Sequence, residues 1–278
     1  MGHDKLRKFK ENEGFGCLLQ PSSESVLNVR DGVFGVKDHE IKGHWDERMF
    51  GGSGRPIVLE LGCGRGEYTV DLALRNGGFN YIGVDIKGAR LWKGAKYAHE
   101  HNLPNVAFLR TRVEFVEAFF APGEVSEIWL TFSDPQLKSE GQRLTSPQFL
   151  ERYRKFLKPG GVVHLKTDSQ FLYRYSLSLA QENGLEILAS TADLYAGGTR
   201  ETLSSAALAS VCGPDSVDAL FEVQTYYERM FLGMGLPITY LSFRIDHEGA
   251  FVSPQSFDTD YWRAAEGTRR SFGHGMQK

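Results

Sequence analysis

A glycine-rich loop between carboxylates is the part of the sequence best suited to bind a small ligand. In VLELGCGRGEY an apolar run ends at Glu60, then Gly62, Gly64 and Gly66 alternate, and a helical pattern begins. Glycines let the backbone approach a ligand and adopt dihedral angles that a Cβ atom would forbid. Asp85 ends the next apolar run, 19 residues after Gly66 (85 − 66). An acidic residue there can bind the two hydroxyl groups of a ribose.

Two ligands and one packing role compete for this loop. A nicotinamide dinucleotide prefers G-x-G-x-x-G, with its pyrophosphate at a helix N-terminus. The pattern here is E-x-G-x-G-x-G, and Glu60 and Glu67 on its two sides oppose a pyrophosphate but suit a cation. S-adenosylmethionine has a sulfonium, an ammonium and a ribose but no phosphate, so the loop favours it. The third alternative is a glycine turn that serves only the packing of helix on strand.

A second polar segment, TFSDPQLKSEGQRLT, occupies residues 131–145 directly after an apolar run. Pro135 cannot continue a central strand, so the strand must end near Asp134. Asp and Pro are ordinary turn formers, and a simple turn is one interpretation. The other is that Asp134 and Lys138 lie at the carboxyl end of a parallel strand, where open α/β sheets bind their ligands.

Apolar runs that alternate with helical patterns predict the frame that positions these residues. Strands are expected at 56–61, 79–86, 106–111, 126–132, 161–167, 185–190 and 237–245. Helices are expected at 67–75, 88–102, 146–157 and 169–184. The helix at 146–157 has Ser146 as its N-cap and is followed by Pro159-Gly160-Gly161. The helix at 169–184 has Ser169 as its N-cap and ends at Gly184. The alternation predicts an α/β fold with a Rossmann-like, seven-stranded, mostly parallel sheet and helices on both faces.

Composition and charge narrow the class of protein. The 278 residues are 41% hydrophobic and 24% charged, as in a soluble globular protein with a sizeable core. The net charge of −3 gives no global sign of a nucleic-acid partner. Basic residues nevertheless gather at the N-terminus, between residues 138 and 158, and in the C-terminal tail. Such patches can guide a polyanion to one face, although most are simply solvated surface.

The cysteines and the N-terminus indicate the compartment. Cys17, Cys63 and Cys212 are far apart and lack C-x-x-C spacing, which argues against a disulfide framework or a zinc site. We therefore expect no metal. The N-terminus lacks the apolar core of a signal peptide, and no apolar run approaches membrane-spanning length. A cytoplasmic protein without a membrane partner is expected.

Four motifs in order resemble one known family. LELGCGRGEY, FSDP followed by Lys138, LKPGGVVHLKTD, and TYYE at 225–228 resemble the bacterial tRNA (guanine-N7-)-methyltransferase family, a group of class I S-adenosylmethionine-dependent methyltransferases. The glycine loop alone indicates only the superfamily, whereas FSDP-x-x-K, KTD and T-x-Y-E together are specific to the family. The resemblance runs from about Lys5 to Ile245. It implies an enzyme that methylates N7 of a guanosine in the variable loop of tRNA.

The alternation of strands and helices divides the chain, and the resemblance implies a role for each matched residue. The division predicts an N-terminal extension (1–50), a methyltransferase domain (51–246, with an insertion at about 193–218) and a C-terminal tail (247–278). Asp134 is implied as the active-site acid. The residues implied to bind S-adenosylmethionine are Glu60, Gly62, Gly64, Gly66 and Asp85, with Arg112 and Glu114 as candidates near the adenine. The residues implied to bind tRNA are Lys138, Asp168, Thr225, Tyr226, Tyr227 and Glu228.

The chemistry of guanine N7 suits these residue types. N7 has an in-plane lone pair and no proton, so its attack on a sulfonium methyl needs no general base. The protein has to align the reactants and tolerate positive charge on the purine. Asp134 can accept hydrogen bonds from donors on the guanine edge, and Lys138 can hold a phosphate or a base acceptor. Three of the residues implied to bind tRNA also have a structural alternative. Asp168 and Thr225 could be helix caps, and Glu228 could pair with Arg229 or a lysine on a helix face.

The sequence departs from the family pattern in ways that keep other functions open. Gln136 replaces a tryptophan, Ser139-Glu140-Gly141 interrupts a basic run, and Arg112 stands where the family usually has an acidic or amide residue. Phosphate contacts supply much of a protein's affinity for RNA, so the loop after Lys138 is expected to bind tRNA more weakly. The alternatives are a methyltransferase for another RNA or a small molecule, a non-catalytic S-adenosylmethionine- or RNA-binding protein and, least favoured, a dehydrogenase. We also expect residues 1–12 to close over the cofactor or the tRNA.

Overall fold

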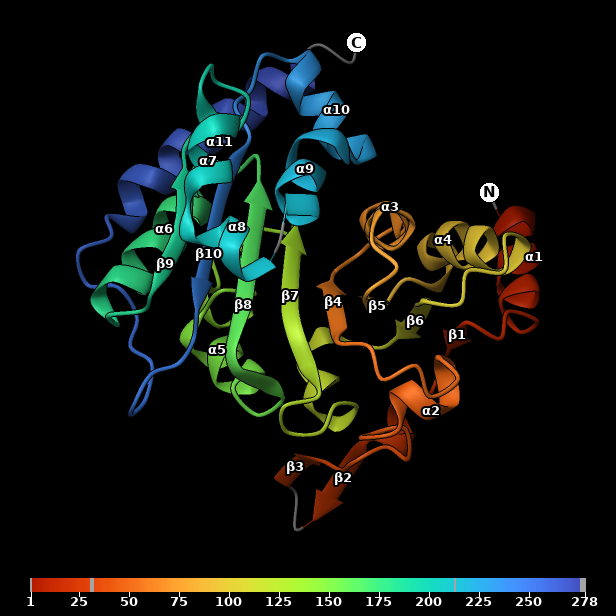
Figure 1. Cartoon of the computed structure of the whole chain (residues 1–278). Coiled ribbons are helices and arrows are strands. Elements are labelled where there is room, and N and C mark those ends of the chain that lie inside the picture. Colours follow the sequence, from red (N-terminus) through yellow and green to blue (C-terminus); the bar gives the residue numbers. More distant parts are fainter. Residues whose placement is uncertain (1, 31–32, 213, 276–278) are drawn as a thin grey trace. The chain divides into compact units, whose positions relative to one another are not determined.

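The computed structural model describes residues 2–30, 33–212 and 214–275 (Figure 1). The chain forms two compact units, each described below by itself. The first comprises Met1–Trp129 and Arg152–Gly161, and the second comprises Leu130–Glu151 and Val162–Lys278. Strands β7 (Val125–Thr131) and β8 (Leu157–Thr167) and helix α5 (Pro147–Tyr153) each contribute residues to both units.

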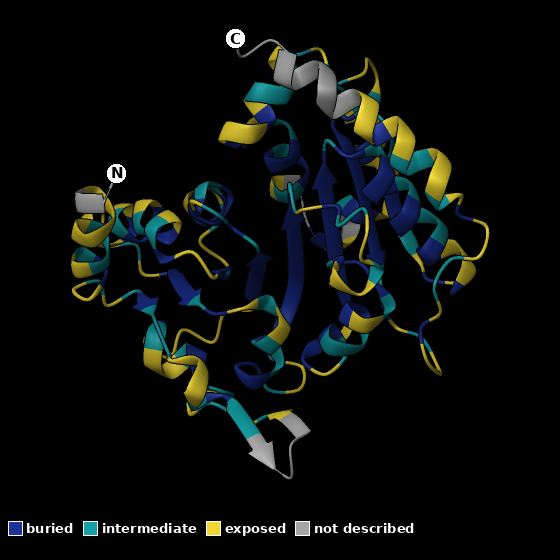
Figure 2. Ribbon diagram, turned by 180° about the vertical axis from the view of Figure 1, so that it is seen from behind, coloured by how far each residue is buried: buried dark blue, intermediate teal, exposed yellow. Residues whose placement is uncertain are grey.

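The first unit is built on a parallel sheet with the strand order β1-β6-β5-β4-β7. Besides β7, its strands are β1 (Leu18–Leu19), β4 (Ile57–Leu61), β5 (Asn80–Asp85) and β6 (Val106–Arg110). Every residue of β4 and β5 is buried (Figure 2), as expected of apolar strands covered on both faces. A separate antiparallel hairpin pairs β2 (Leu27–Arg30) with β3 (Val33–Val36).

Helices flank this sheet and include the N-terminal segment. The helical elements are α1 (Gly2–Asn12), η1 (Ser23–Ser25), α2 (Trp45–Met49), α3 (Glu67–Arg75), α4 (Gly88–Glu100) and η2 (Val113–Ala118). Helix α1 packs on α4, because Asn12 donates a hydrogen bond to the Gly88 carbonyl over 2.9 Å and Trp92 Nε1 donates to Glu11 over 2.6 Å. Residues 1–12, apart from Met1, therefore form a helix docked on the first unit. Their closing over a ligand stays a prediction.

The second unit contains strands in the order β8-β10-β9, with β10 antiparallel to both neighbours. Strand β9 spans Ile187–Thr191 and β10 spans Thr239–Arg244. Its helical elements are η3 (Glu140–Gln142), α6 (Gln170–Glu182), α7 (Thr199–Ser205), α8 (Ala207–Cys212), α9 (Pro214–Glu222), α10 (Tyr226–Gly233) and α11 (Thr259–Gly275). Helix α6 packs on β10, and α11 in turn packs on α6. The segment predicted as an insertion at 193–218 is thus mainly helical, and the tail contains a long helix.

The predicted fold class is confirmed: the chain is an α/β protein with a mostly parallel sheet flanked by helices, and each of the seven predicted strands is present. The predicted cap of α6 is also confirmed, since Leu172 N donates to Ser169 Oγ over 3.1 Å. Gly184 follows the helix with a φ of +63°, the left-handed conformation that commonly ends helices.

The predicted helix at 146–157 is wrong at its end. Helix α5 ends at Tyr153, and β8 begins at Leu157 and includes Pro159-Gly160-Gly161, which the sequence predicted as a loop. The backbone at Gly161 passes so close to Leu157 that an added Cβ would lie 2.6 Å from Leu157 Cγ. A glycine can therefore extend the strand where another residue could not. Ser146 precedes α5 as predicted, but its buried hydroxyl makes no hydrogen bond among the described residues.

Among the described residues, no helix is long and apolar enough to span a bilayer.

Candidate active site

The glycine loop joins β4 to α3, and its glycines have two different tasks. Gly62, Gly64 and Gly66 all have positive φ, at +78°, +57° and +70°, a region that residues with a Cβ rarely adopt. A Cβ at Gly66 would lie 2.5 Å from Phe108 Cε1, so this glycine is also needed for packing. A Cβ at Gly64 would meet no atom within 4 Å. The backbone at Gly64 therefore borders open space, as a ligand-binding loop requires.

Asp85 connects this loop to the end of β5. Its Oδ2 accepts a hydrogen bond from Gly64 N over 3.0 Å, and its Oδ1 accepts one from Lys87 N over 2.7 Å. The side chain is 8% exposed. Each carboxylate oxygen has a second lone pair, so Asp85 can hold the loop and still accept hydrogen bonds from a ligand's hydroxyl groups.

Glu60 has a structural role that the sequence did not reveal. Its Oε2 accepts hydrogen bonds from the backbone N and the hydroxyl of Thr69, over 2.9 and 2.5 Å. Thr69 lies in the first turn of α3, where backbone N–H groups have no partner within the helix. Glu60 therefore caps α3 from the neighbouring strand, and its predicted contact with S-adenosylmethionine remains a prediction.

The electrostatic field at the loop is negative. Burial raises the pKa of the Cys63 thiol well above its ordinary value, and the charges of Glu60 and Asp85 raise it further. A site that disfavours a thiolate also disfavours a pyrophosphate, whereas it stabilises a sulfonium and an ammonium group. The residues present therefore fit S-adenosylmethionine better than a dinucleotide.

The other two predicted cofactor residues, Arg112 and Glu114, lie at the start of η2 in the same unit. Their side chains are 56% and 48% exposed, and 3.9 Å separates Arg112 Nε from Glu114 Oε2. The structure places them after β6, as predicted, whereas hydrogen bonds join Asp85 to the glycine loop and Glu60 to α3.

Asp134 lies in a strained turn after β7, in the second unit. Phe132 and Gln136, on either side of it, have φ values of +51° and +47°, which cost energy for residues other than glycine and are found most often at functional sites. Asp134 Oδ1 accepts a hydrogen bond from Gln136 N over 2.9 Å, so Asp134 does form a turn, as the structural interpretation predicted. The side chain is nevertheless exposed, and its Oδ2 makes no hydrogen bond among the described residues.

Contacts on both sides of Phe132 hold this turn. Phe132 N donates a hydrogen bond to the Lys166 carbonyl of β8 over 2.9 Å. Its ring stacks on Phe231 of α10, with 6.3 Å between ring centroids. The strained conformation is therefore fixed by a strand and a helix of the same unit. Lys138, four residues beyond Asp134, is exposed, and its ammonium group makes no ion pair or hydrogen bond among the described residues.

The KTD and TYYE motifs meet through a buried ion pair. Lys166 Nζ lies 2.7 Å from Glu228 Oε1, and both side chains are fully buried. Lys166 also donates to the carbonyls of Leu220 and Val223, over 2.6 and 3.2 Å. Burial lowers the pKa of Lys166, and the Glu228 charge opposes this shift. Glu228 is thus a buried partner of a lysine, and the alternative of a pair on the helix surface is wrong.

The remaining predicted substrate residues surround this pair. Thr225 Oγ1 accepts a hydrogen bond from Glu228 N over 3.2 Å and caps α10, as its structural alternative proposed. Asp168 is half-buried between β8 and Ser169, and it is Ser169 that caps α6. Tyr226 and Tyr227 are 48% and 44% exposed, with their rings edge to face.

Sequence reasoning missed Lys166 and Tyr195, which both bind Glu228. Tyr195 donates its hydroxyl hydrogen to Glu228 Oε1 over 2.7 Å, whereas Glu228 Oε2 is buried without a partner among the described residues. A signal for Lys166 was present, because a lysine inside the apolar strand VVHLKT has to find a buried acid. No comparable signal marked Tyr195.

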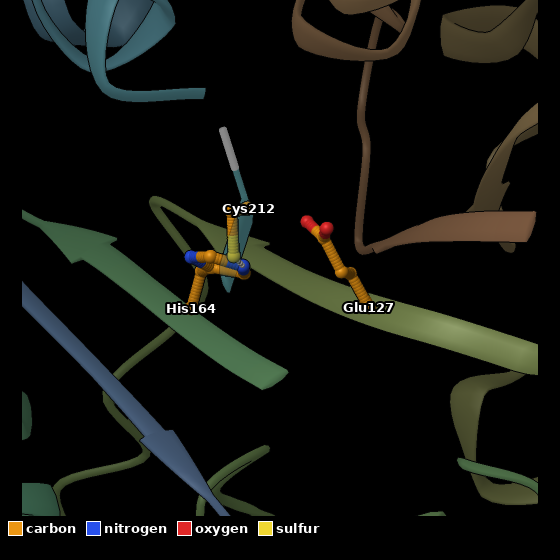
Figure 3. Close-up of side chains that lie close together, drawn as sticks. All are labelled: Glu127, His164 and Cys212. Carbon is orange, nitrogen blue, oxygen red and sulfur yellow. Dashed lines mark hydrogen bonds between the residues drawn. The ribbon is translucent and has the colours of Figure 1, made fainter. Parts of the chain in front are cut away.

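A second buried polar pair, His164 and Cys212, links β8 to the end of α8 (Figure 3). Cys212 Sγ lies 3.8 Å from His164 Nε2, and the Tyr240 hydroxyl lies 2.8 Å from His164 Nδ1. Both ring nitrogens therefore have partners within the second unit. That the protein uses no metal remains a prediction.

Comparisons with known proteins find methyltransferases among the proteins similar to this chain. A family described as "Putative methyltransferase" matches residues 54–205. The chain is 43% identical to the tRNA (guanine-N(7)-)-methyltransferase of Bacteroides thetaiotaomicron, over 98% of each chain. It is 48% identical to the enzyme of the same name from Christiangramia forsetii, over 87% of this chain and 98% of that one. The crystal structure of the 16S rRNA methyltransferase KamB shares the fold, with a TM-score of 0.52 and 15% identity over 82% of this chain and 100% of that one.

Proposed function

The chain belongs to the tRNA (guanine-N(7)-)-methyltransferase family, and we therefore propose that it methylates N7 of a guanosine in the variable loop of tRNA, with S-adenosylmethionine as methyl donor. The observation that carries the proposal is the match to a relative of this name over 98% of both chains.

The first unit has the residues that this proposal needs for the methyl donor. S-adenosylmethionine would supply a methyl group on a cationic sulfur. The open backbone at Gly64 leaves room for a bound molecule, and Asp85 can accept hydrogen bonds from ribose hydroxyl groups. The charges of Glu60 and Asp85, which add to the effect of burial on the Cys63 pKa, favour a cationic ligand. Arg112 and Glu114 remain the candidates for contact with the adenine.

The second unit has the residues that the proposal needs for the guanosine. No proton leaves N7 during the attack, so Asp134 is needed as a hydrogen-bond acceptor rather than as a base. Its exposed Oδ2 can accept a hydrogen bond from the N–H groups of the guanine edge and so stabilise the positive charge that the purine gains. The turn fixes this carboxylate through Gln136 N, which spares the cost of ordering it on binding.

The tRNA would contact the exposed residues of the same unit first. Lys138 has a free ammonium group for a phosphate, and the exposed rings of Tyr226 and Tyr227 can stack on unpaired bases. Glu228 is fully buried, so it would support the TYYE segment from beneath, and Asp168 completes the proposed substrate side. We place this activity in the cytoplasm, where tRNA is found, and propose that it needs no metal ion.

Methyl transfer tests the proposal directly. A tRNA transcript without N7-methylguanosine is incubated with labelled S-adenosylmethionine at low salt, and the modified nucleoside is identified by mass spectrometry. We expect N7-methylguanosine from the wild type and a loss of about 100-fold in rate for Asp134→Ala. Asp193→Ala is the matched control, because Asp193 accepts the same kind of turn hydrogen bond, from Tyr195 N over 3.1 Å. We expect it to keep its rate.

Two outcomes would contradict the proposal. Cofactor binding without any labelled tRNA would mean that the protein acts on another RNA or a small molecule, or only binds its ligand. Equal methylation rates for Asp134→Ala and Asp193→Ala would mean that Asp134 does not take part in methyl transfer, even if tRNA is the substrate.

A further inference from the structure

The loop that begins at Asp134 also forms one wall of a polar pocket of about 280 Å³. All of its lining residues belong to the second unit. The loop supplies Lys138, Glu140 and Arg143, and helix α6 supplies Tyr175. The C-terminal segment supplies Ser253, Pro254, Gln255 and Phe257, with Thr259 and Arg263 of α11. The tail, whose basic residues the sequence indicated as a patch that can guide a polyanion, thus shares a pocket with the loop of the proposed active-site acid.

Arg143 is fixed at the base of this loop. It is only 3% exposed, and its guanidinium lies over the rings of Phe171 and Tyr175, 4.7 and 4.5 Å from their centroids. Its Nε donates a hydrogen bond to the Gln136 carbonyl over 3.3 Å. Burial lowers the pKa of Arg143, Tyr175 and the charge of Glu140 oppose this shift, and the charge of Arg263 adds a smaller lowering. Glu140 therefore offsets part of the positive charge that Arg143 and Arg263 bring to the loop.

Arg263 comes from α11 to the same loop. Its Nε donates a hydrogen bond to the Leu137 carbonyl over 3.0 Å, and its Nη1 lies 3.0 Å from Asp260, an exposed acid in the first turn of α11. Arg143 therefore binds the loop backbone at Gln136, and Arg263 binds it at Leu137. Both bonds use the Nε–H, which leaves N–H groups of each guanidinium for a ligand.

The charge of the lining is positive. Lys138, Arg143 and Arg263 face one acid, Glu140, whose Oε1 accepts a hydrogen bond from the Tyr175 hydroxyl over 2.6 Å. Two arginines and a lysine around a small polar pocket match the oxygens of a phosphate group. The pocket volume of about 280 Å³ is large enough to admit a phosphodiester group.

We propose that this pocket binds a backbone phosphate of the RNA substrate, close in sequence to the guanosine that Asp134 contacts. The inference rests on the proposed function for the identity of the RNA, but the pocket itself is defined by Arg143, Arg263 and the C-terminal helix. Because Ser139-Glu140-Gly141 interrupts the basic run of the family, α11 supplies the positive charge that the loop lacks. Glu140 limits the strength of the phosphate contact.

The test measures the affinity of the full-length protein for tRNA between 50 and 200 mM salt. Each phosphate contact contributes about 0.9 to the slope of log K against log salt concentration. We expect Arg263→Gln to lower the slope by about 0.9 and to weaken binding at low salt. Arg48→Gln is the control, because Arg48 is an exposed arginine paired with Glu40 over 3.2 Å in the first unit. We expect it to leave the slope unchanged.

A second variant with the opposite effect separates ligand binding from folding. Glu140→Gln removes the acid's charge but keeps an oxygen that can accept the Tyr175 hydrogen bond. We expect it to bind tRNA more tightly than the wild type, whereas a purely structural role for Glu140 predicts weaker or equal binding. Inorganic phosphate serves as a free competitor. We expect it to displace tRNA from the wild type at lower concentration than from Arg263→Gln.

The outcomes distinguish this inference from the proposed function. Wild-type methylation of tRNA, with an unchanged slope for Arg263→Gln and no tighter binding by Glu140→Gln, would overturn the pocket and leave the function intact. A lower slope for Arg263→Gln and tighter binding by Glu140→Gln, without any methylation of tRNA, would support the pocket and overturn the function. Equal effects of Arg263→Gln and Arg48→Gln would mean that only net charge matters, and would also overturn the pocket.

Discussion

The buried pair of Lys166 and Glu228 should make the effects of two mutations strongly non-additive. Lys166→Met leaves the Glu228 carboxylate buried without its cation, and Glu228→Leu leaves the ammonium without its anion. Breaking a buried ion pair from one side costs about 3–5 kcal/mol. The two single variants should therefore lose about 6–10 kcal/mol of unfolding free energy when summed.

The double variant should be destabilised far less than this sum. It has no uncompensated charge from this pair, and the bonds described for it that are lost are those from Lys166 to the Leu220 and Val223 carbonyls and from Tyr195 to Glu228. At about 1 kcal/mol for each bond, the loss is about 3 kcal/mol. The expected coupling energy is therefore at least about 3 kcal/mol.

Urea unfolding of the four proteins, followed by circular dichroism, measures this coupling. The midpoint and slope of each curve give the unfolding free energy, and equal slopes show that the unfolded states are comparable. A double variant whose loss equals the sum of the two single losses would refute the ion pair as the link between the two motifs.

Three further predictions follow from local geometry. Gly64→Ala and Gly123→Ala should each cost about 1–2 kcal/mol of stability, because both glycines have positive φ and open space at Cβ, but calorimetry should show weaker S-adenosylmethionine binding only for Gly64→Ala. Ser169→Ala should lower the unfolding free energy by about 1 kcal/mol in urea titrations, since it removes the cap of α6, and a loss below the error would contradict the cap. Burial raises the pKa of Cys17 to about 11, so at pH 8 about one thiol in a thousand is ionised. The rate of iodoacetamide labelling of the native protein, read by mass spectrometry, should therefore rise about tenfold per pH unit. A labelling rate that stays constant above pH 8 would contradict this.

The sequence predicted the elements whose formation depends on local pattern. Strands such as 57–61 follow from continuous apolar runs, and α6 follows from a helical pattern with Ser169 before it and Gly184 after it. The glycine loop and Asp85 were also predictable, because their roles depend on backbone conformation and on the position at a strand end. The predicted helix at 146–157 failed at its end, because Leu157 belongs to β8, a strand that pairs with the sequence-distant β10.

The contacts that build the substrate side depend on distant residues and were not predictable. Arg263 reaches the loop at Leu137 from 126 positions away, and nothing near either residue indicates the other. Lys166 was passed over because it stands in an apolar strand beside the more conspicuous Asp168. Glu228 is buried by the packing of α10 within the second unit, and it therefore pairs with Lys166 instead of forming a surface contact. The sequence pattern does not reveal this packing.

One aromatic ring limits the order in which this sequence can change during evolution. The Phe108 ring occupies space that three side chains would need: an added Cβ at Gly66, Gly83 or Gly94 would come within 2.5, 2.8 or 2.7 Å of it. A substitution at any of these glycines is therefore blocked while residue 108 is phenylalanine. If residue 108 first becomes smaller, the glycines lose this contact, although Gly66 keeps its positive φ, and a Cβ at Gly83 or Gly94 would still lie 2.8 Å from Thr69 Oγ1 or the Arg65 carbonyl. Lineages of such enzymes should accordingly lose Gly83 only after residues 108 and 69 have both changed, and should keep Gly94 as long as the backbone at Arg65 keeps its course.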